Sequence, residues 1–154
     1  MDTVKKLTGL TVALFCVLLV ASAGQFCVNA DLKWYSSLVK PFFTPTPLGF
    51  TFTVTVVYAL CIAVITRLVV GKRFFPSLTV LALTGVLAVL FLFVVFRLRN
   101  LYGGVVVAVA LFLLSAALEV RFVVKDWVLA AVYAPVALFN AFCLVLTSVL
   151  AMTN

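Results

Sequence analysis

Side chains that could carry acid–base chemistry are few in this chain, and none lies at the centre of an apolar stretch. Histidine is absent, and the acidic residues are Asp2, Asp31, Glu119 and Asp126. Ser115 and Ser148 have no base near them in the sequence, and there is no glycine-rich phosphate loop. We therefore expect no enzymatic activity. The lack of a carboxylate within an apolar stretch also argues against a proton-coupled transporter.

The cysteines match no known metal-binding or redox spacing. They are Cys16, Cys27, Cys61 and Cys143. All four lie inside apolar stretches, where a free thiol behaves as a small hydrophobic group. We expect no bound metal, no cofactor and no disulfide framework.

The composition indicates a membrane protein. Of the 154 residues, 67% are hydrophobic and 10% are charged, and the mean hydropathy is +1.38. Soluble domains have about 45–50% apolar and about 25% charged residues. The net charge is +7, but the cations stand singly or in pairs between apolar stretches. That distribution is typical of the flanks of membrane spans, so we expect lipid and not nucleic acid as the partner.

Five apolar stretches are long enough to cross a bilayer, which requires about 20 mostly apolar residues. They cover approximately residues 7–28, 47–70, 74–96, 101–120 and 127–151. A loop over residues 29–46 and turns at residues 71–73, 97–100 and 121–126 separate them. The prediction is one all-α membrane domain over residues 1–154, a bundle of five transmembrane helices in which sequential helices are antiparallel.

The positive charges favour a cytoplasmic amino terminus in a bacterial-type membrane. The side that carries the amino terminus would have seven cations: Lys5, Lys6, Arg67, Lys72, Arg73, Arg121 and Lys125. The other side would have four: Lys33, Lys40, Arg97 and Arg99.

The first stretch has a second interpretation, because it also resembles a secretory signal peptide. It begins after Lys5 and Lys6 and contains Ala21, Ser22 and Ala23. Cleavage would leave four spans. The apolar stretch of about 22 residues is longer than the usual signal segment of about 7–15 residues, which favours a retained span.

The most informative segment is WYSSLVKPFFTPTPLGFTFTVTVVY, from Trp34 to Tyr58. Pro41, Pro45 and Pro47 fix the backbone and disfavour helix before them. Trp34 and its neighbour Tyr35 are typical of the aromatic belt at a membrane surface. The segment predicts a rigid, partly extended loop that leads into the second helix.

The spacing in this segment resembles that of the translocator protein family (TspO/MBR, the tryptophan-rich sensory proteins). The matching positions are Trp34, Tyr35, Leu38, Lys40, Pro41, Phe43, Pro45, Phe50 and Tyr58. The last helix keeps the family's register at Pro135, Phe139, Phe142 and Asn154. The resemblance covers all five spans in layout, whereas its specific motifs cover about a third of the chain.

The chain departs from the family pattern mainly in its tryptophans, of which it has two. The positions where the family has tryptophan are Phe43, Val54, Leu87 and Phe139 here, and Thr84 replaces an asparagine. Family members are described as acting on porphyrins through these tryptophans. Their loss argues against porphyrin breakdown and for a shifted ligand preference.

The resemblance implies an apolar ligand pocket among the helices, under the first loop. Its expected walls are Phe43, Phe50, Val54, Leu87, Phe139 and Phe142, with Tyr58 and Thr84 as hydrogen-bonding groups. The family binds tetrapyrroles such as porphyrins, sterols and flat aromatic drugs, in transport, sensing or stress regulation. It also implies the mitochondrial outer membrane for a eukaryotic chain and the cell membrane for a bacterial one.

Small residues in the fourth span suggest close helix packing and, as in many family members, a homodimer. They are Gly103, Gly104, Ser115, Ala116 and Ala117. Two alternatives to a ligand-binding protein remain. One is a small multipass exporter, although such exporters carry a carboxylate in the first helix and residues 7–28 have none. The other is a scaffold membrane protein without a small ligand.

Overall fold

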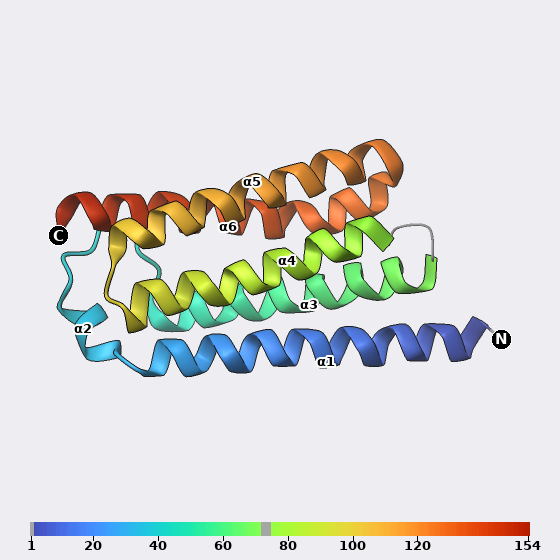
Figure 1. Ribbon diagram of the computed structural model, residues 1–154, viewed down its shortest axis with the longest axis horizontal. Helices are drawn as coiled ribbons and strands as arrows, with labels where there is room; N and C mark the ends of the chain where they lie inside the picture. Colours follow the sequence, from blue (N-terminus) through green and yellow to red (C-terminus); the bar gives the residue numbers. More distant parts are fainter. Residues whose placement is uncertain (1, 72–74) are drawn as a thin grey trace.

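The computed structural model describes residues 2–71 and 75–154, and within those ranges it contains helices and no strands. The elements are α1 (Asp2–Asn29), α2 (Leu32–Ser37), α3 (Pro47–Gly71), α4 (Phe75–Leu92), η1 (Phe93–Arg97), α5 (Leu101–Lys125) and α6 (Trp127–Thr153) (Figure 1). In the described residues, five helical segments are long and apolar enough to cross a membrane. They confirm the predicted five-helix membrane bundle.

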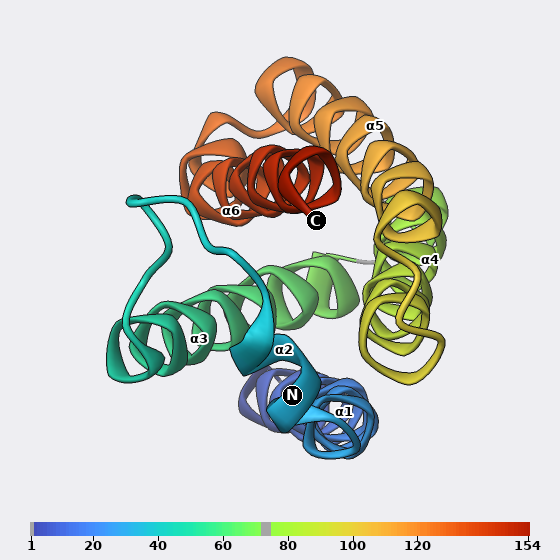
Figure 2. The ribbon, with the colours of Figure 1, turned by 90° about the vertical axis from the view of Figure 1, so that its left-hand side faces the viewer.

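The long helices run side by side along one axis (Figure 1). Because the number of spans is odd, the amino and carboxyl termini lie at opposite ends of the bundle. Figure 2 looks from the end that carries the carboxyl terminus, where α2 and the following loop lie in front of the helix ends. Helix α5 packs most extensively on α6, and α1 packs on α3.

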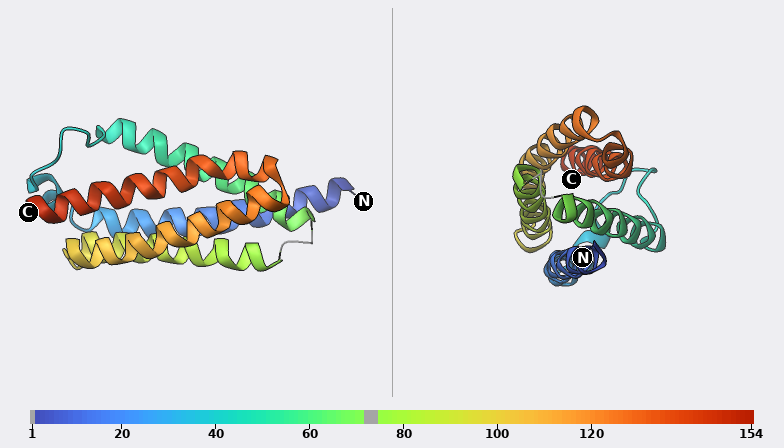
Figure 3. Two further views of the ribbon diagram at one scale, coloured as in Figure 1. Left: turned by 90° about the horizontal axis from the view of Figure 1, so that it is seen from above. Right: turned by 90° about the vertical axis from the view of Figure 1, so that its right-hand side faces the viewer.

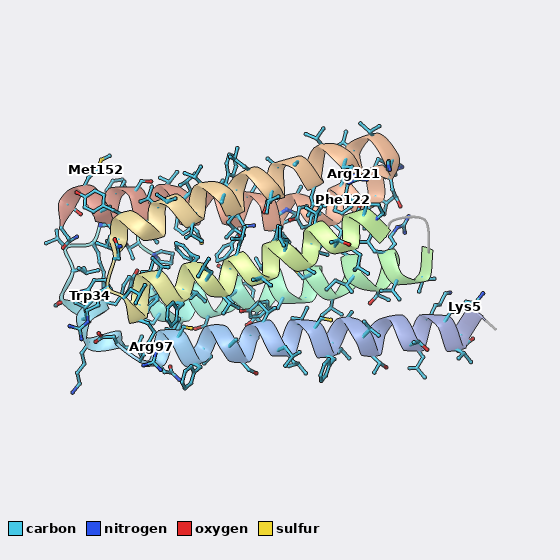
Figure 4. The ribbon with its side chains drawn as sticks, viewed as in Figure 1. Lys5, Trp34, Arg97, Arg121, Phe122 and Met152 are labelled. Atoms are coloured by element: carbon cyan, nitrogen blue, oxygen red, sulfur yellow. The ribbon has the colours of Figure 1, made fainter. Side chains whose placement is uncertain are left out.

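Two clusters of buried apolar side chains hold the bundle together. One lies toward the end with the amino terminus and includes Val64, Leu118 and Phe122. The other lies toward the opposite end and includes Phe96 and Leu146. Between and around them, apolar side chains point outward along the helices (Figure 4). Exposed apolar side chains of this kind are what lipid would cover.

Two helix boundaries differ from the predicted ones. Helix α5 continues to Lys125, so the predicted turn at residues 121–126 reduces to Asp126. Its charged residues do not break the helix. Asp126 ends α5 and begins α6, because its carboxylate accepts hydrogen bonds from the backbone N–H groups of Val128 and Leu129. Helix α1 likewise begins at Asp2, before the predicted start at residue 7.

The predicted loop over residues 29–46 contains a short helix, which corrects the expectation of a continuous loop. Helix α2 has six residues, LKWYSS. The hydroxyl groups of Ser36 and Ser37 donate to backbone oxygens of Lys33 and Trp34, three residues earlier. Such a short helix has no hydrophobic period that could reveal it.

The third span ends in the π-helical turn η1, which carries it to Arg97. Arg99 then adopts a left-handed backbone conformation with φ 52°, and Asn100 caps α5 by accepting from the N–H of Gly103 at 2.8 Å. Residues 72–74 lie outside the described residues. They include the predicted start of this span and part of the preceding turn.

Candidate functional site

The loop over residues 38–46 crosses the end of the bundle between α2 and α3 (Figure 2). It contains Pro41 and Pro45, and a turn in which the N–H of Thr44 donates to the Pro41 oxygen at 3.0 Å. Prolines restrict the backbone before folding, so ordering this loop costs less entropy than ordering an ordinary loop. The loop therefore forms a rigid cover over this end of the bundle, and we call residues 38–46 the cover loop.

Asn154 binds this cover to the end of α6. Its side-chain Oδ1 accepts from the backbone N–H of Val39 at 2.8 Å, and its Nδ2 donates to the Val39 oxygen at 3.0 Å. The hydroxyl of Thr153 also donates to the Val39 oxygen, at 3.4 Å. The side-chain amide thus pairs with both backbone groups of one loop residue, as a neighbouring strand would.

Aromatic contacts hold α2 against the ends of the spans. The ring of Tyr35 lies 5.2 Å from that of Phe96, and the Lys40 ammonium lies 4.7 Å from the centre of the Tyr35 ring. Burial raises the pKa of Tyr35, and neighbouring Cys143 raises it further, so its hydroxyl stays protonated. Trp34, Tyr35 and Leu38 pack against the second core cluster.

An ion pair between Arg99 and Asp31 joins the two loops at this end of the bundle. Arg97 lies over the ring of Phe26, 4.8 Å from its centre. The segment that the sequence singled out therefore has a structural role, because its tryptophan, tyrosine and lysine fix the cover in place.

A pocket of about 330 Å³ lies beneath the loop between α3 and α6. Its walls are Pro45, Phe50, Thr53, Pro135, Leu138, Phe139 and Phe142. The ring centres of Phe50 in α3 and Phe139 in α6 are 6.1 Å apart, and their planes are tilted by 46° to each other. Leu138 is 70% exposed, so the pocket opens sideways toward the surface that lipid would cover.

Three of the eight predicted ligand-binding residues line this pocket: Phe50, Phe139 and Phe142. Phe43 stands behind it, because its ring lies 6.4 Å from that of Phe142. The structure thus brings together the aromatic residues from the loop, the second span and the last span.

The other four predicted residues lie elsewhere in the bundle. They are Val54, Tyr58, Thr84 and Leu87, none of which lines the pocket. Thr84 is buried and donates to the Leu81 oxygen at 2.6 Å. The Tyr58 hydroxyl lies 3.9 Å from the position a Cβ would take at Gly24, so it faces α1. A ligand-binding role for any of the eight stays a prediction.

Sequence reasoning did not single out Thr53 and Leu138 as walls of the pocket. Each lies three residues after another wall residue, Phe50 and Pro135, and residues at this spacing share a helix face. Helical periodicity counted from the aromatic positions was the signal that could have found them. Pro135 has no N–H, so the helix also lacks one internal hydrogen bond beside the pocket.

Polar side chains also meet inside the bundle, away from the pocket. The Asn140 amide donates to the Ser115 hydroxyl at 2.6 Å, which joins α6 to α5. The Tyr133 hydroxyl is buried without a described hydrogen-bond partner. Among the described residues, no group of three or more His, Cys, Asp or Glu side chains could hold a metal ion.

Two comparisons with known proteins bear on this arrangement. A search of the curated proteins finds no match. The family model described as the TspO/MBR family matches residues 12–152, which include all of the pocket walls and the cover loop. A match of this extent agrees with the five spans and with the register of the aromatic positions. The chain therefore belongs to the TspO/MBR family.

Proposed function

We propose that this integral, multi-pass membrane protein binds a flat apolar small molecule in the pocket between α3 and α6, and that binding serves transport, sensing or stress regulation. The pocket beneath the cover loop is the observation that carries the proposal. Its volume of about 330 Å³ is at the lower end of the range of about 300–1,000 Å³ that ligand sites occupy.

The lining favours recognition by shape and apolar area. Thr53 is the polar side chain among the seven wall residues, and its hydroxyl already donates to the Gly49 oxygen at 2.9 Å. Affinity would come from apolar surface removed from water, at roughly 25 cal/mol per Å². The rings of Phe50 and Phe139, which are tilted by 46° to each other, offer aromatic surface to a planar ligand.

The same lining ranks the ligand classes that the family suggests. A porphyrin with carboxylate side chains would find no cation among the wall residues. A sterol or a flat aromatic compound brings no such charge to bury. We therefore place sterols and flat aromatic compounds ahead of tetrapyrroles.

A matched pair of variants on α3 tests the site. Phe50 lines the pocket, whereas Phe52 is 72% exposed and does not. Phe50→Trp puts a larger ring into the pocket and takes space from the ligand, so we expect ligand affinity to fall about fivefold or more, the equivalent of about 1 kcal/mol. Phe52→Trp makes the same chemical change outside the pocket and should leave affinity unchanged. Equilibrium binding of a sterol, a flat aromatic compound and protoporphyrin to purified protein measures both.

Two results would count against the proposal. Equal effects of the two substitutions would place the ligand elsewhere on the bundle. If the folded wild-type protein shows no saturable binding, the ligand-binding proposal is wrong and the scaffold alternative is favoured.

A further inference from the structure

A second and larger cavity lies at the opposite end of the bundle from the proposed ligand pocket. It is a groove of about 1020 Å³ over α3, with α1 and α6 as its sides. Figure 3, right, looks at this end of the molecule and shows α3 between α1 and α6. Nothing in the proposed function uses this groove.

Small side chains make the groove hollow. Ala59 and Ala63 lie on the exposed side of α3 and line it, while Leu10 of α1 and Val132 of α6 form apolar sides. From Arg67 to Ala59 the groove follows α3 for about 12 Å, at 1.5 Å per residue. An apolar channel of this length runs from the end of the bundle into the part that the hydrocarbon core would surround.

Two cations stand at the outer end of the groove, Lys6 from α1 and Arg67 from α3. Arg67 donates from Nε to the Asp126 carboxylate at 2.9 Å, and its Nη2 lies 2.8 Å from the same oxygen. This ion pair compensates one positive charge. Lys6 is exposed and forms no ion pair among the described side chains, which therefore leave one positive charge uncompensated at the outer end.

We propose that this groove binds an anionic phospholipid, with an acyl chain along Ala59 and Ala63 and the phosphate at Lys6 and Arg67. The layout, cationic outside and apolar inside, matches the layout of such a lipid along the membrane normal. Basic sites between transmembrane helices bind anionic headgroups in this way. The guanidinium has five N–H donors, so Arg67 can serve a phosphate while it keeps its bond to Asp126.

The predicted orientation of the chain agrees with this occupant. The cation count favours a cytoplasmic position for the end that carries Lys6. The cytoplasmic leaflet is also the one that holds anionic lipids and a negative surface potential. A sterol is neutral and would make no use of the cations. A second copy of the chain would bring its own cations close to them, and like charges repel.

Two lysines side by side provide a matched test of the charge. Lys6 lines the groove and Lys5 does not. Purified protein is exposed to equal amounts of phosphatidylglycerol and phosphatidylcholine, and the retained lipid is counted by native mass spectrometry. We expect preferential retention of phosphatidylglycerol. Lys6→Gln should reduce that preference about fivefold, the equivalent of about 1 kcal/mol per basic residue, and Lys5→Gln should leave it unchanged.

A second pair of variants tests the acyl chain. Ala63→Leu fills the groove without changing charge, whereas Ala82→Leu makes the same change at an exposed position of α4 outside it. We expect retention of phosphatidylglycerol to fall with Ala63→Leu alone. Glycerol phosphate, which has the anionic group without acyl chains, should not compete.

The proposal is overturned by any of four results. These are equal effects of Lys5→Gln and Lys6→Gln, equal retention of the two lipids, no effect of Ala63→Leu, and displacement by glycerol phosphate. Failure of the ligand titration at Phe50 has no bearing on these measurements, because the two sites lie at opposite ends of the bundle.

Discussion

Asn154 shows how a single side chain can control a loop that lies far from it in the sequence. It pairs with both backbone groups of Val39, which is 115 residues away. The sequence places Asn154 in the family register, but no local pattern reveals its partner. The contact exists because the odd number of spans brings the carboxyl end of α6 beside the first loop.

Replacing Asn154 should loosen the cover loop. In Asn154→Ala the backbone N–H of Val39 loses its acceptor, and a hydrogen bond worth about 1 kcal/mol corresponds to about fivefold faster amide exchange. Asn154→Asp keeps an acceptor for that N–H and loses only the donor, so its exchange should stay closer to wild type. Hydrogen exchange at Val39 in detergent measures both. Unchanged exchange in Asn154→Ala would show that the prolines and aromatic contacts alone hold the loop.

Asp126 makes stability depend on pH. Partial burial would raise its pKa, but hydrogen bonds from Arg67 and from the backbone N–H groups of Leu129 and Val128 outweigh burial and lower the pKa below its usual value. A carboxyl group of an unfolded chain titrates at about pH 3.9. The stabilising contribution is therefore complete above about pH 4, and it is lost as the pH falls through the lower folded-state pKa.

The comparison with Asp126→Asn isolates the charge, because asparagine can still cap α6. We expect wild type to have the higher melting temperature at neutral pH. The difference should shrink below about pH 4. Thermal unfolding in detergent over a pH series follows both proteins. Parallel curves for the two proteins would mean that the pair with Arg67 adds no stability.

At the scale of an element, Gly104 sets how closely α5 approaches its neighbours. A Cβ at this position would lie 2.5 Å from Cγ2 of Val95 in η1 and 3.4 Å from Cγ2 of Thr147 in α6. Val95 is buried and β-branched, so it has little freedom to move away. Gly104 and Ser115 both lie inside the bundle, so they serve packing within one chain, and the homodimer that the small residues suggested stays a prediction.

Gly104→Ala should therefore destabilise the bundle by about 1–3 kcal/mol, as overpacked substitutions do. Gly85→Ala is the matched control, because its Cβ would make an ordinary contact of 3.4 Å with Val20. Alanine is the better helix former by about 0.5–1 kcal/mol, so Gly85→Ala should be neutral or slightly stabilising. Thermal unfolding of the two variants in one detergent gives the comparison. If Gly104→Ala is as stable as Gly85→Ala, Val95 and the rest of η1 can move aside at little cost in free energy.

At the scale of the whole molecule, the five spans could be predicted because hydrophobic length is a local property of the sequence. The turn at residues 121–126 was misplaced because charge does not end a helix, whereas the cap at Asp126 does. Helix α2 was missed because six residues carry no usable period. The resemblance supplied Phe50, Phe139 and Phe142, but Val54 and Tyr58 could be excluded from the pocket only once the rotation of α3 was known.

The sideways opening of the pocket beside Leu138 determines how a ligand would reach it. A ligand that partitions strongly into the bilayer is dissolved almost entirely in the hydrocarbon, and it reaches this opening from there. The apparent dissociation constant, expressed as total ligand per volume of sample, should then rise in proportion to the lipid added, while its value per mole of lipid stays constant. Titrations of wild-type protein in vesicles at several lipid concentrations measure this scaling. If the molecule works in this way, its response in a cell depends on how strongly a compound partitions into the bilayer.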